Sequence, residues 1–276
     1  MPDEVHPQGS APVQAPDRRA RSREAPPPPL PDRHLVAGTP ISLTSYSEVL
    51  ALLDRRPRDR ALRVVCCNVH SVMTARRDPE VAAALRGADI ATPDGMPLVW
   101  ALRREARPDQ ERVYGPDLMA AALRHGVERS WTHYLYGATE PTLACLREAI
   151  ASLAPAARIA GWYAPPFRPL DEAEERAVLA QLRRSRADIV WVGLGIPKQE
   201  LWMQRVHAAL PVVALLGVGA AFDLLSGTVR QAPGWVQDRG LEWLYRLARE
   251  PRRLAPRYLA TKPAFMALMA REMLRR

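Results

Sequence analysis

Three polar residues that could act on a substrate each follow an apolar run of the sequence. Asn68, Asp94 and Asp223 come at or near the ends of stretches rich in Val, Leu, Ile and Ala. Such runs are typical of strands that are buried on both faces of a parallel sheet. A carboxylate or carboxamide at a strand end can bind a hydroxyl group, and a carboxylate can also take its proton. These positions are therefore the first candidates for a substrate site.

Each of these three residues also has a simpler interpretation. Asp94 lies in a Pro-Asp-Gly turn and could be a general base, but it could equally be the N-cap of the helix that follows. Local sequence alone favours the cap. Asn68 could bind a substrate hydroxyl or form an Asx-turn after its strand. Asp223 could accept hydrogen bonds from a ribose or base, or make a local turn bond.

A glycine-containing turn within 187–200 offers a place for an anion. An apolar run is followed by Gly193 and Gly195, and then Lys198 and Gln199 fall in the first turn of an expected helix. Unpaired N–H groups and the positive end of the helix dipole make such a turn favourable for phosphate. Gly-x-Gly after a strand is a weak signal by itself, and an ordinary strand-to-helix turn is the alternative.

Two further candidates lie elsewhere in the chain. Arg112, in the sequence Glu-Arg-Val-Tyr-Gly, could grip a diphosphate through two parallel hydrogen bonds, or it could be an ordinary surface arginine. Gly219, in the glycine-containing segment 217–223, is a candidate for close contact with a substrate.

The order of the elements predicts how these residues come together. Apolar runs at about 62–67, 88–92, 132–137, 187–192 and 212–216 alternate with segments of helical pattern. This alternation is typical of an α/β fold, a Rossmann-like parallel sheet with helices on both faces. Ligands of such sheets bind at the carboxyl ends of the strands. We therefore expect the candidate residues to meet at that edge.

Composition divides the chain into three parts. Residues 1–34 contain nine prolines and equal numbers of acidic and basic residues, which predicts a disordered tail. We expect residues 35–240 to form the α/β domain. In 241–276, apolar residues at helical spacing are mixed with arginines, and we expect two amphipathic helices broken by Pro251 and Pro256.

The positive charge is concentrated at the C-terminal end. Residues 246–276 contain nine basic and two acidic residues and so carry +7 of the net charge of +9. A basic end on a nearly neutral body suggests an anionic partner, such as a membrane surface, a nucleic acid or a phosphorylated substrate. The five arginines that we single out as a membrane and diphosphate-binding group are Arg246, Arg249, Arg252, Arg253 and Arg257.

Cysteine and histidine patterns argue against other kinds of site. Three cysteines cannot form a disulfide framework, and no His or Cys spacing resembles a metal site, so we expect neither a metal nor a cofactor. The sequence also has no Gly-x-Ser-x-Gly nucleophile motif and no Asp-x-Asp pair.

Taken together, the motifs resemble the WecG/TagA/CpsF family of bacterial glycosyltransferases. The matching stretches are 88–100, 111–119, 192–200, 217–223 and 230–247, and the resemblance covers about 41–257. It implies an inverting, metal-independent enzyme that moves a hexose-type sugar from a UDP-sugar to a polyprenyl-diphosphate-linked acceptor. The sugars used across the family include N-acetylmannosamine, its uronic acid and glucose. The family acts peripherally at the inner, cytoplasmic face of the membrane in cell-surface polysaccharide synthesis.

The resemblance also implies roles for individual residues. Asp94 matches the proposed base, Arg112 matches an arginine near the donor diphosphate, and Gln199 and Asn68 match substrate-site positions. Cys66 stands where the family has a threonine, and because a thiol is a weak hydrogen-bonding group, this departure could mark a different donor sugar. The basic C-terminal segment matches a part of the family that is associated with membrane attachment.

Two other functions fit parts of the sequence. A nucleotide-binding oxidoreductase on a Rossmann sheet is disfavoured because no early Gly-x-Gly-x-x-Gly with a following acidic residue is present. An RNA-binding protein is disfavoured because the basic segment has few aromatic residues for base stacking, so we expect no nucleic-acid partner.

Overall fold

The computed structural model describes residues 28–57, 59–210 and 213–274, and within the last helix it leaves out the side chains at 253, 257, 260 and 272–274. Most of the predicted tail therefore lies outside the described residues. Two of its residues, Arg33 and His34, belong to the first strand, which pairs with the second as an antiparallel hairpin. These two residues are held by the ladder hydrogen bonds of the hairpin. The strands are β1 (Arg33–Val36) and β2 (Thr39–Ser42).

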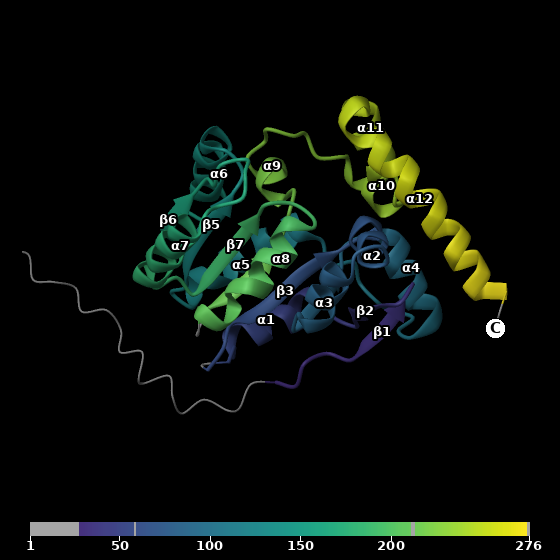
Figure 1. Ribbon diagram of the computed structural model, residues 1–276, viewed down its shortest axis with the longest axis horizontal. Helices are drawn as coiled ribbons and strands as arrows, with labels where there is room; N and C mark the ends of the chain where they lie inside the picture. Colours follow the sequence, from purple (N-terminus) through teal and green to yellow (C-terminus); the bar gives the residue numbers. More distant parts are fainter. Residues whose placement is uncertain (1–27, 58, 211–212, 275–276) are drawn as a thin grey trace, which may run out of the picture.

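A six-stranded parallel sheet forms the centre of the molecule (Figure 1), as predicted. Its order is β4-β3-β8-β7-β5-β6, so two strands from the second half of the chain, β8 and β7, lie between β3 and β5 of the first half. The strands are β3 (Leu62–Cys67), β4 (Ile90–Pro93), β5 (Thr132–Gly137), β6 (Arg158–Tyr163), β7 (Ile189–Gly193) and β8 (Ala214–Gly217).

Helices cover both faces of this sheet. Successive side chains of a strand point to opposite faces, and they divide accordingly: Val65 and Val190 join one buried cluster, and Val64 and Ile189 join the other. The first cluster is covered mainly by α2 (Val69–Ala75), α3 (Pro79–Gly87), α4 (Met96–Glu105), α7 (Glu172–Ser185) and α8 (Lys198–Val206). The second is covered by α1 (Tyr46–Asp54), α5 (Gly115–Glu128), α6 (Glu140–Leu153) and α9 (Ala221–Leu225).

The C-terminal part forms helices whose breaks differ from the predicted ones. After the 3₁₀ turn η2 (His207–Ala209) and β8 come α9, α10 (Gly234–Asp238), α11 (Glu242–Arg249) and α12 (Pro251–Leu274). Pro251 begins α12, whereas Pro256 lies inside it. Each internal proline removes one helical hydrogen bond, but Leu254 and Phe265 are buried and hold the helix against the body, where it packs beside α2 (Figure 1).

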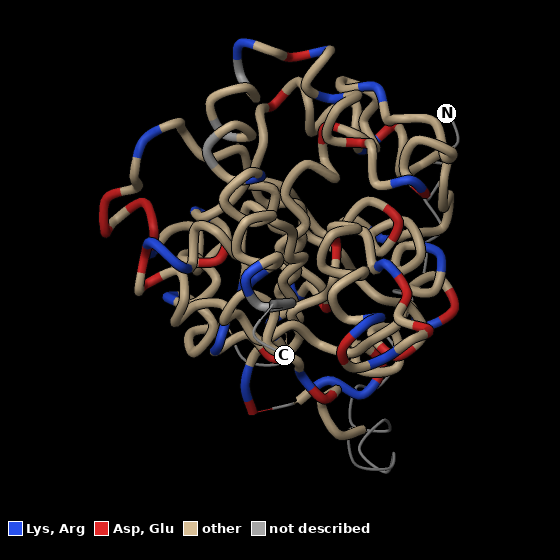
Figure 2. Tube along the Cα trace, turned by 90° about the vertical axis from the view of Figure 1, so that its right-hand side faces the viewer, with Lys and Arg blue, Asp and Glu red and all other residues tan. Residues whose placement is uncertain are grey.

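Several large apolar side chains of this part stay exposed. Leu244, Leu259 and Met266 on α11 and α12 are 48–71% exposed. In the described part of the chain no helix is both long and apolar enough to cross a bilayer. Lys and Arg positions are mixed with Asp and Glu positions along the trace (Figure 2).

Candidate active site

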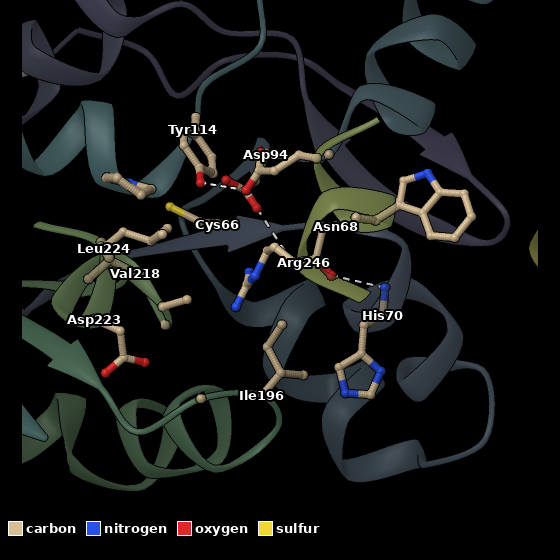
Figure 3. A pocket seen from close by; sticks show the side chains of 18 of the residues that line it. Cys66, Asn68, His70, Asp94, Tyr114, Ile196, Val218, Asp223, Leu224 and Arg246 are labelled. Atoms are coloured by element: carbon tan, nitrogen blue, oxygen red, sulfur yellow. Dashed lines mark hydrogen bonds between the residues drawn. The ribbon is translucent and has the colours of Figure 1, made fainter. Parts of the chain in front are cut away.

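A cavity of about 430 Å³ opens at the carboxyl ends of β3, β4, β7 and β8 and is bordered on another side by α11 and α12. Figure 3 shows residues of these elements turned toward one space, with the Arg246 side chain projecting into it from the C-terminal part. This cavity lies at the edge of the sheet where the strand-end rule places ligands. The predicted residues that line the cavity are Cys66, Asn68, Asp94, Arg112, Gly193, Gly195, Gln199, Gly219, Asp223 and Arg246.

Asp94 is not the cap of the helix that follows it. The N-cap of α4 is Gly95, and no side chain caps that helix. The Asp94 carboxylate instead accepts a hydrogen bond from the N–H of Gly115, the first residue of α5, at 2.9 Å from Oδ1. Its other oxygen, Oδ2, lies 3.5 Å from the amide nitrogen of Asn68. Capping a distant helix holds the carboxylate at the cavity wall.

The surroundings of Asp94 raise the pKa of its carboxyl group above the ordinary value. Burial is the largest cause, because it disfavours the charged form, and the charge of Glu242 acts in the same direction. The Arg112 charge and the hydrogen bonds from Gly115 and Asn68 oppose it. A carboxylate with a raised pKa is a stronger proton acceptor when ionised, which is the property that a general base requires.

Asn68 is the N-cap of α2, so its side-chain oxygen makes a local turn bond to the backbone, which was the simpler of its two interpretations. Oδ1 accepts the N–H groups of His70 and Ser71 at 2.9 and 3.3 Å. This leaves the amide nitrogen facing Asp94. In this arrangement Asn68 orients the carboxylate, and its oxygen is used by the protein itself.

Arg112 is held by protein groups, and its bidentate grip on a diphosphate stays a prediction. Its Nε donates to the Asp94 carbonyl oxygen at 2.6 Å, and its Nη2 donates to Glu242 Oε2 at 2.7 Å. Its guanidinium also lies 3.8 Å from the centre of the Tyr114 ring. Nε and Nη2 are the two nitrogens on one edge of the guanidinium that can bind a single anion together, and both are occupied by protein oxygens. Only Nη1 has no hydrogen-bond partner among the described residues.

Gln199 joins the two glycine-containing turns. Its side-chain Oε1 accepts the N–H of Gly219 at 3.0 Å, and its Nε2 donates to Glu200 Oε1 at 3.0 Å. Its own backbone N–H bonds to the carbonyl oxygen of Gly195. The backbone N–H of Gln199, which the sequence offered to a phosphate, and that of Gly219 are thus both used within the protein. Glu200 is buried, and burial raises its pKa to about 7.

Gly193 and Gly195 are required for different structural reasons. The third candidate of this segment, Lys198, lies outside the cavity. A Cβ on Gly193 would come within 2.7 Å of the Phe222 ring, so this position serves packing. Gly195 has φ +75°, and a Cβ added there would meet nothing within 4 Å, so its surface is open to the cavity. Lys198 is exposed, because the inward face of α8 is taken by Gln199 and the residues that follow it.

Of the five arginines singled out, one lines the cavity. Arg246 does so, and its Nε is buried with no hydrogen-bond partner in the described structure. Arg249 and Arg252 are exposed and do not line the cavity. The side chains of Arg253 and Arg257 lie outside the described residues.

Cys66 is buried at the cavity wall, where the resemblance expects a threonine. Burial raises the pKa of its thiol far above the ordinary value, so the group is neutral at physiological pH. It therefore acts as a small apolar surface. Among the described residues, no three side chains of His, Cys, Asp and Glu come together as potential ligands of a metal ion.

Several cavity residues were not predicted from the sequence. Tyr114 and Glu242 are hydrogen-bonded to each other at 2.6 Å, and Trp243, Tyr258 and Lys262 line the cavity from α11 and α12. A signal for Glu242 was present: it is an acidic residue at the start of a basic segment, four residues before Arg246. Residues four apart share one helical face, so both were placed to enter the same cavity.

The chain is similar to known proteins. A family model described as "Glycosyl transferase WecG/TagA/CpsF family" matches residues 34–276. The chain is also 30% identical over 190 residues to the N-acetylglucosaminyldiphosphoundecaprenol N-acetyl-beta-D-mannosaminyltransferase of Bacillus spizizenii strain W23, covering 69% of this chain and 72% of that protein. The chain therefore belongs to the WecG/TagA/CpsF family of glycosyl transferases.

Proposed function

We propose that this protein transfers a hexose-type sugar from a UDP-sugar to a polyprenyl-diphosphate-linked acceptor, with inversion and without a metal ion, in the synthesis of a cell-surface polysaccharide. N-acetylmannosamine is the first donor sugar to test, because the Bacillus relative is named for its transfer to an N-acetylglucosaminyl-diphosphoundecaprenol. The uronic acid of that sugar and glucose are the next candidates.

One observation carries this proposal: a proton acceptor and an unpaired guanidinium nitrogen line the same cavity. Asp94 is a buried carboxylate with a raised pKa, and Arg246 brings a buried Nε that has no partner among the described residues. Leaving a buried charged donor unpaired is costly unless a ligand supplies the acceptor. A diphosphate supplies such acceptors, and charge-assisted bonds of this kind are strong.

These groups fit an inverting displacement. The acceptor hydroxyl attacks the anomeric carbon from the side opposite the UDP group, while Asp94 takes the hydroxyl proton. The bond from the anomeric carbon to the diphosphate oxygen breaks, and UDP leaves with the electron pair. Charge that develops on the diphosphate is met by Arg246 and by the backbone of the turn at Gly195, which is open to the cavity. Donors placed in advance for developing charge are often the largest contribution to catalysis.

The C-terminal helices suit an acceptor that is held in a membrane. α11 and α12 border the cavity and carry exposed apolar side chains beside the exposed arginines Arg249 and Arg252. Basic side chains near an anionic leaflet contribute ~1 kcal/mol each. We therefore propose peripheral attachment to the inner face of the cytoplasmic membrane through this part of the chain.

The decisive test supplies the protein with a soluble polyprenyl-diphosphate N-acetylglucosamine analogue and each of several UDP-sugars. We expect release of UDP and a product one hexose heavier with a single donor, and an anomeric configuration opposite to that of the donor by NMR. Activity should persist in EDTA. A thermal-shift panel should show stabilisation by UDP and none by NAD or an oligonucleotide. Stabilisation by NAD alone, with no transfer from any donor, would contradict the proposal.

A further inference from the structure

Glu242 is an acidic residue placed in the wall of the candidate active site by the C-terminal part of the chain. It is the first residue of α11, and its side chain is only 12% exposed. Oε1 accepts a hydrogen bond from the Tyr114 hydroxyl at 2.6 Å, and Oε2 accepts one from Arg112 Nη2 at 2.7 Å. Both carboxylate oxygens are thus used by residues that lie far earlier in the sequence.

The two partners of Glu242 lead back to Asp94, Arg112 directly and Tyr114 through the residue that follows it. Arg112 donates from Nε to the Asp94 carbonyl oxygen at 2.6 Å. Tyr114 is followed directly by Gly115, whose N–H donates to Asp94 Oδ1 at 2.9 Å. The Arg112 guanidinium stacks on the Tyr114 ring, so the two partners also hold one another. Glu242 is therefore linked to the main chain of Asp94 through Arg112, and to its side chain through Tyr114 and the adjoining Gly115.

We propose that Glu242 is a positioning residue that holds Arg112 away from the Asp94 carboxylate, an inference that rests on the proposed role of Asp94 as the base. Arg112 already contacts the Asp94 main chain, and an arginine without another counter-ion would turn to the neighbouring carboxylate, since bidentate arginine–carboxylate pairs are strong. Such a pair would occupy the oxygen that must accept the proton. Glu242 provides the competing carboxylate and keeps Arg112 on the main chain.

The charge balance around Asp94 fits this role. Burial and the Glu242 charge raise the pKa of Asp94, while the Arg112 charge lowers it. Removing the Glu242 charge leaves the Arg112 charge unopposed, and the pKa of Asp94 falls. The titratable and charged groups that face Asp94, from β3, α1, the segment before α5, and α11, are Cys66, Cys67, Tyr46, Arg112, Tyr114 and Glu242.

The test is the pH profile of kcat/KM for Glu242→Gln, a substitution that removes the charge and keeps the size. We expect the acid limb of the profile to move to lower pH, so that the variant retains a larger fraction of its maximum at acid pH than the unmodified protein does. Because a weaker base transfers the proton more slowly, kcat should fall about tenfold, part of the ~10²–10⁴ that a general base supplies. KM for the donor should change little.

Two variants serve as controls. Glu242→Asp keeps the charge with a shorter reach, and we expect its acid limb to stay where it is in the unmodified protein. Asn68→Ser keeps a good N-cap for α2 and removes the amide that donates to Asp94. That amide lowers the pKa of Asp94, so the limb should move to higher pH, opposite to the shift from Glu242→Gln.

Each outcome decides the inference. If Glu242→Gln keeps both its acid limb and its kcat while Asp94→Asn is inactive, Glu242 only ties α11 to the body and the inference is wrong, with the proposed function intact. If Asp94→Asn is active, the base assignment itself fails. If Glu242→Gln does not fold, the pH profile of Glu242→Asp decides instead. An acid limb of kcat/KM that moves to lower pH in this variant, although the charge is retained, contradicts the inference.

Discussion

Replacing Asp94 by Asn tests the proposed chemistry with little structural disturbance. The Asn side chain has nearly the same shape, and its Oδ1 can still accept the Gly115 N–H that Asp94 accepts at 2.9 Å. Its Nδ2 would take the place of Oδ2 and face the Asn68 amide nitrogen, so the weak bond at 3.5 Å is lost. Such a bond contributes about 1 kcal/mol or less to stability. We therefore expect the variant to fold and to melt close to the unmodified protein.

The expected loss of turnover is much larger than this structural change. A general base contributes ~10²–10⁴ to the rate, which corresponds to about 2.7–5.4 kcal/mol in the activation free energy. Because Asn cannot accept the proton, the full contribution should disappear. The groups that we assign to the donor diphosphate, Arg246 and the turn at Gly195, are unchanged, so donor binding should survive.

Two measurements check this prediction together. Turnover is followed as UDP release with saturating donor and acceptor, and donor binding is followed by calorimetry or by the thermal shift with UDP. The pH profile adds a third observation. For the unmodified protein, kcat/KM should fall as pH drops below the raised pKa of Asp94, and in Asp94→Asn this limb should be absent. A variant that keeps its turnover to within about tenfold, with the acid limb in place, would refute the base assignment.

Three further predictions follow from packing, burial and charge. Gly193→Ala places a methyl group 2.7 Å from the buried Phe222 ring, and overpacking of this kind should cost about 1–3 kcal/mol, seen as a lower melting temperature. Glu200 has a pKa of about 7 in the folded protein against an ordinary value of 4.5. Since the folded state binds the proton more tightly, the free energy of unfolding of the protein should fall as pH rises from about 4.5 through 7. In Glu200→Gln, urea unfolding at several pH values should show that this pH dependence is lost. The double substitution Arg249→Glu and Arg252→Glu should weaken binding to anionic vesicles by about thirtyfold or more, from ~1 kcal/mol for each lost basic residue.

Matched controls separate these effects from general damage. For the first, Gly234→Ala adds a methyl group where nothing lies within 4 Å, so its melting temperature should not fall; equal losses in both variants would contradict the packing argument. For the Glu200 prediction, a pH dependence of unfolding that is unchanged in Glu200→Gln would mean that other groups cause it. For the third, reversing the exposed Arg124 and Arg184 on the helices of the body should leave vesicle binding intact.

Much of the fold could be predicted from the sequence because its signals are local. The runs at 62–67 and 132–137 are apolar, rich in residues that favour strands and bounded by turn residues, and they became β3 and β5 with the predicted bounds. Alternation of such runs with helical patterns determines a parallel sheet. Since ligands of these sheets bind where the strands end, the positions of Asn68, Asp94 and Asp223 were sufficient to predict that they share one cavity.

The partners of the candidate residues depend on contacts between distant parts of the chain. Local sequence favoured Asp94 as a cap of its own helix, whereas the structure bonds it to Gly115 of another. Arg112 was a candidate for the ligand, but the carboxylate of Glu242 approaches it from α11.

The sequence by itself determined the class of fold and predicted several of the residues that line the cavity at the carboxyl ends of the strands, because periodicity and motif spacing record these directly. Only the tertiary structure decided what each side chain contacts there. A hydrogen bond or ion pair depends on a few tenths of an ångström between groups that are far apart in the chain, and no local pattern encodes that distance.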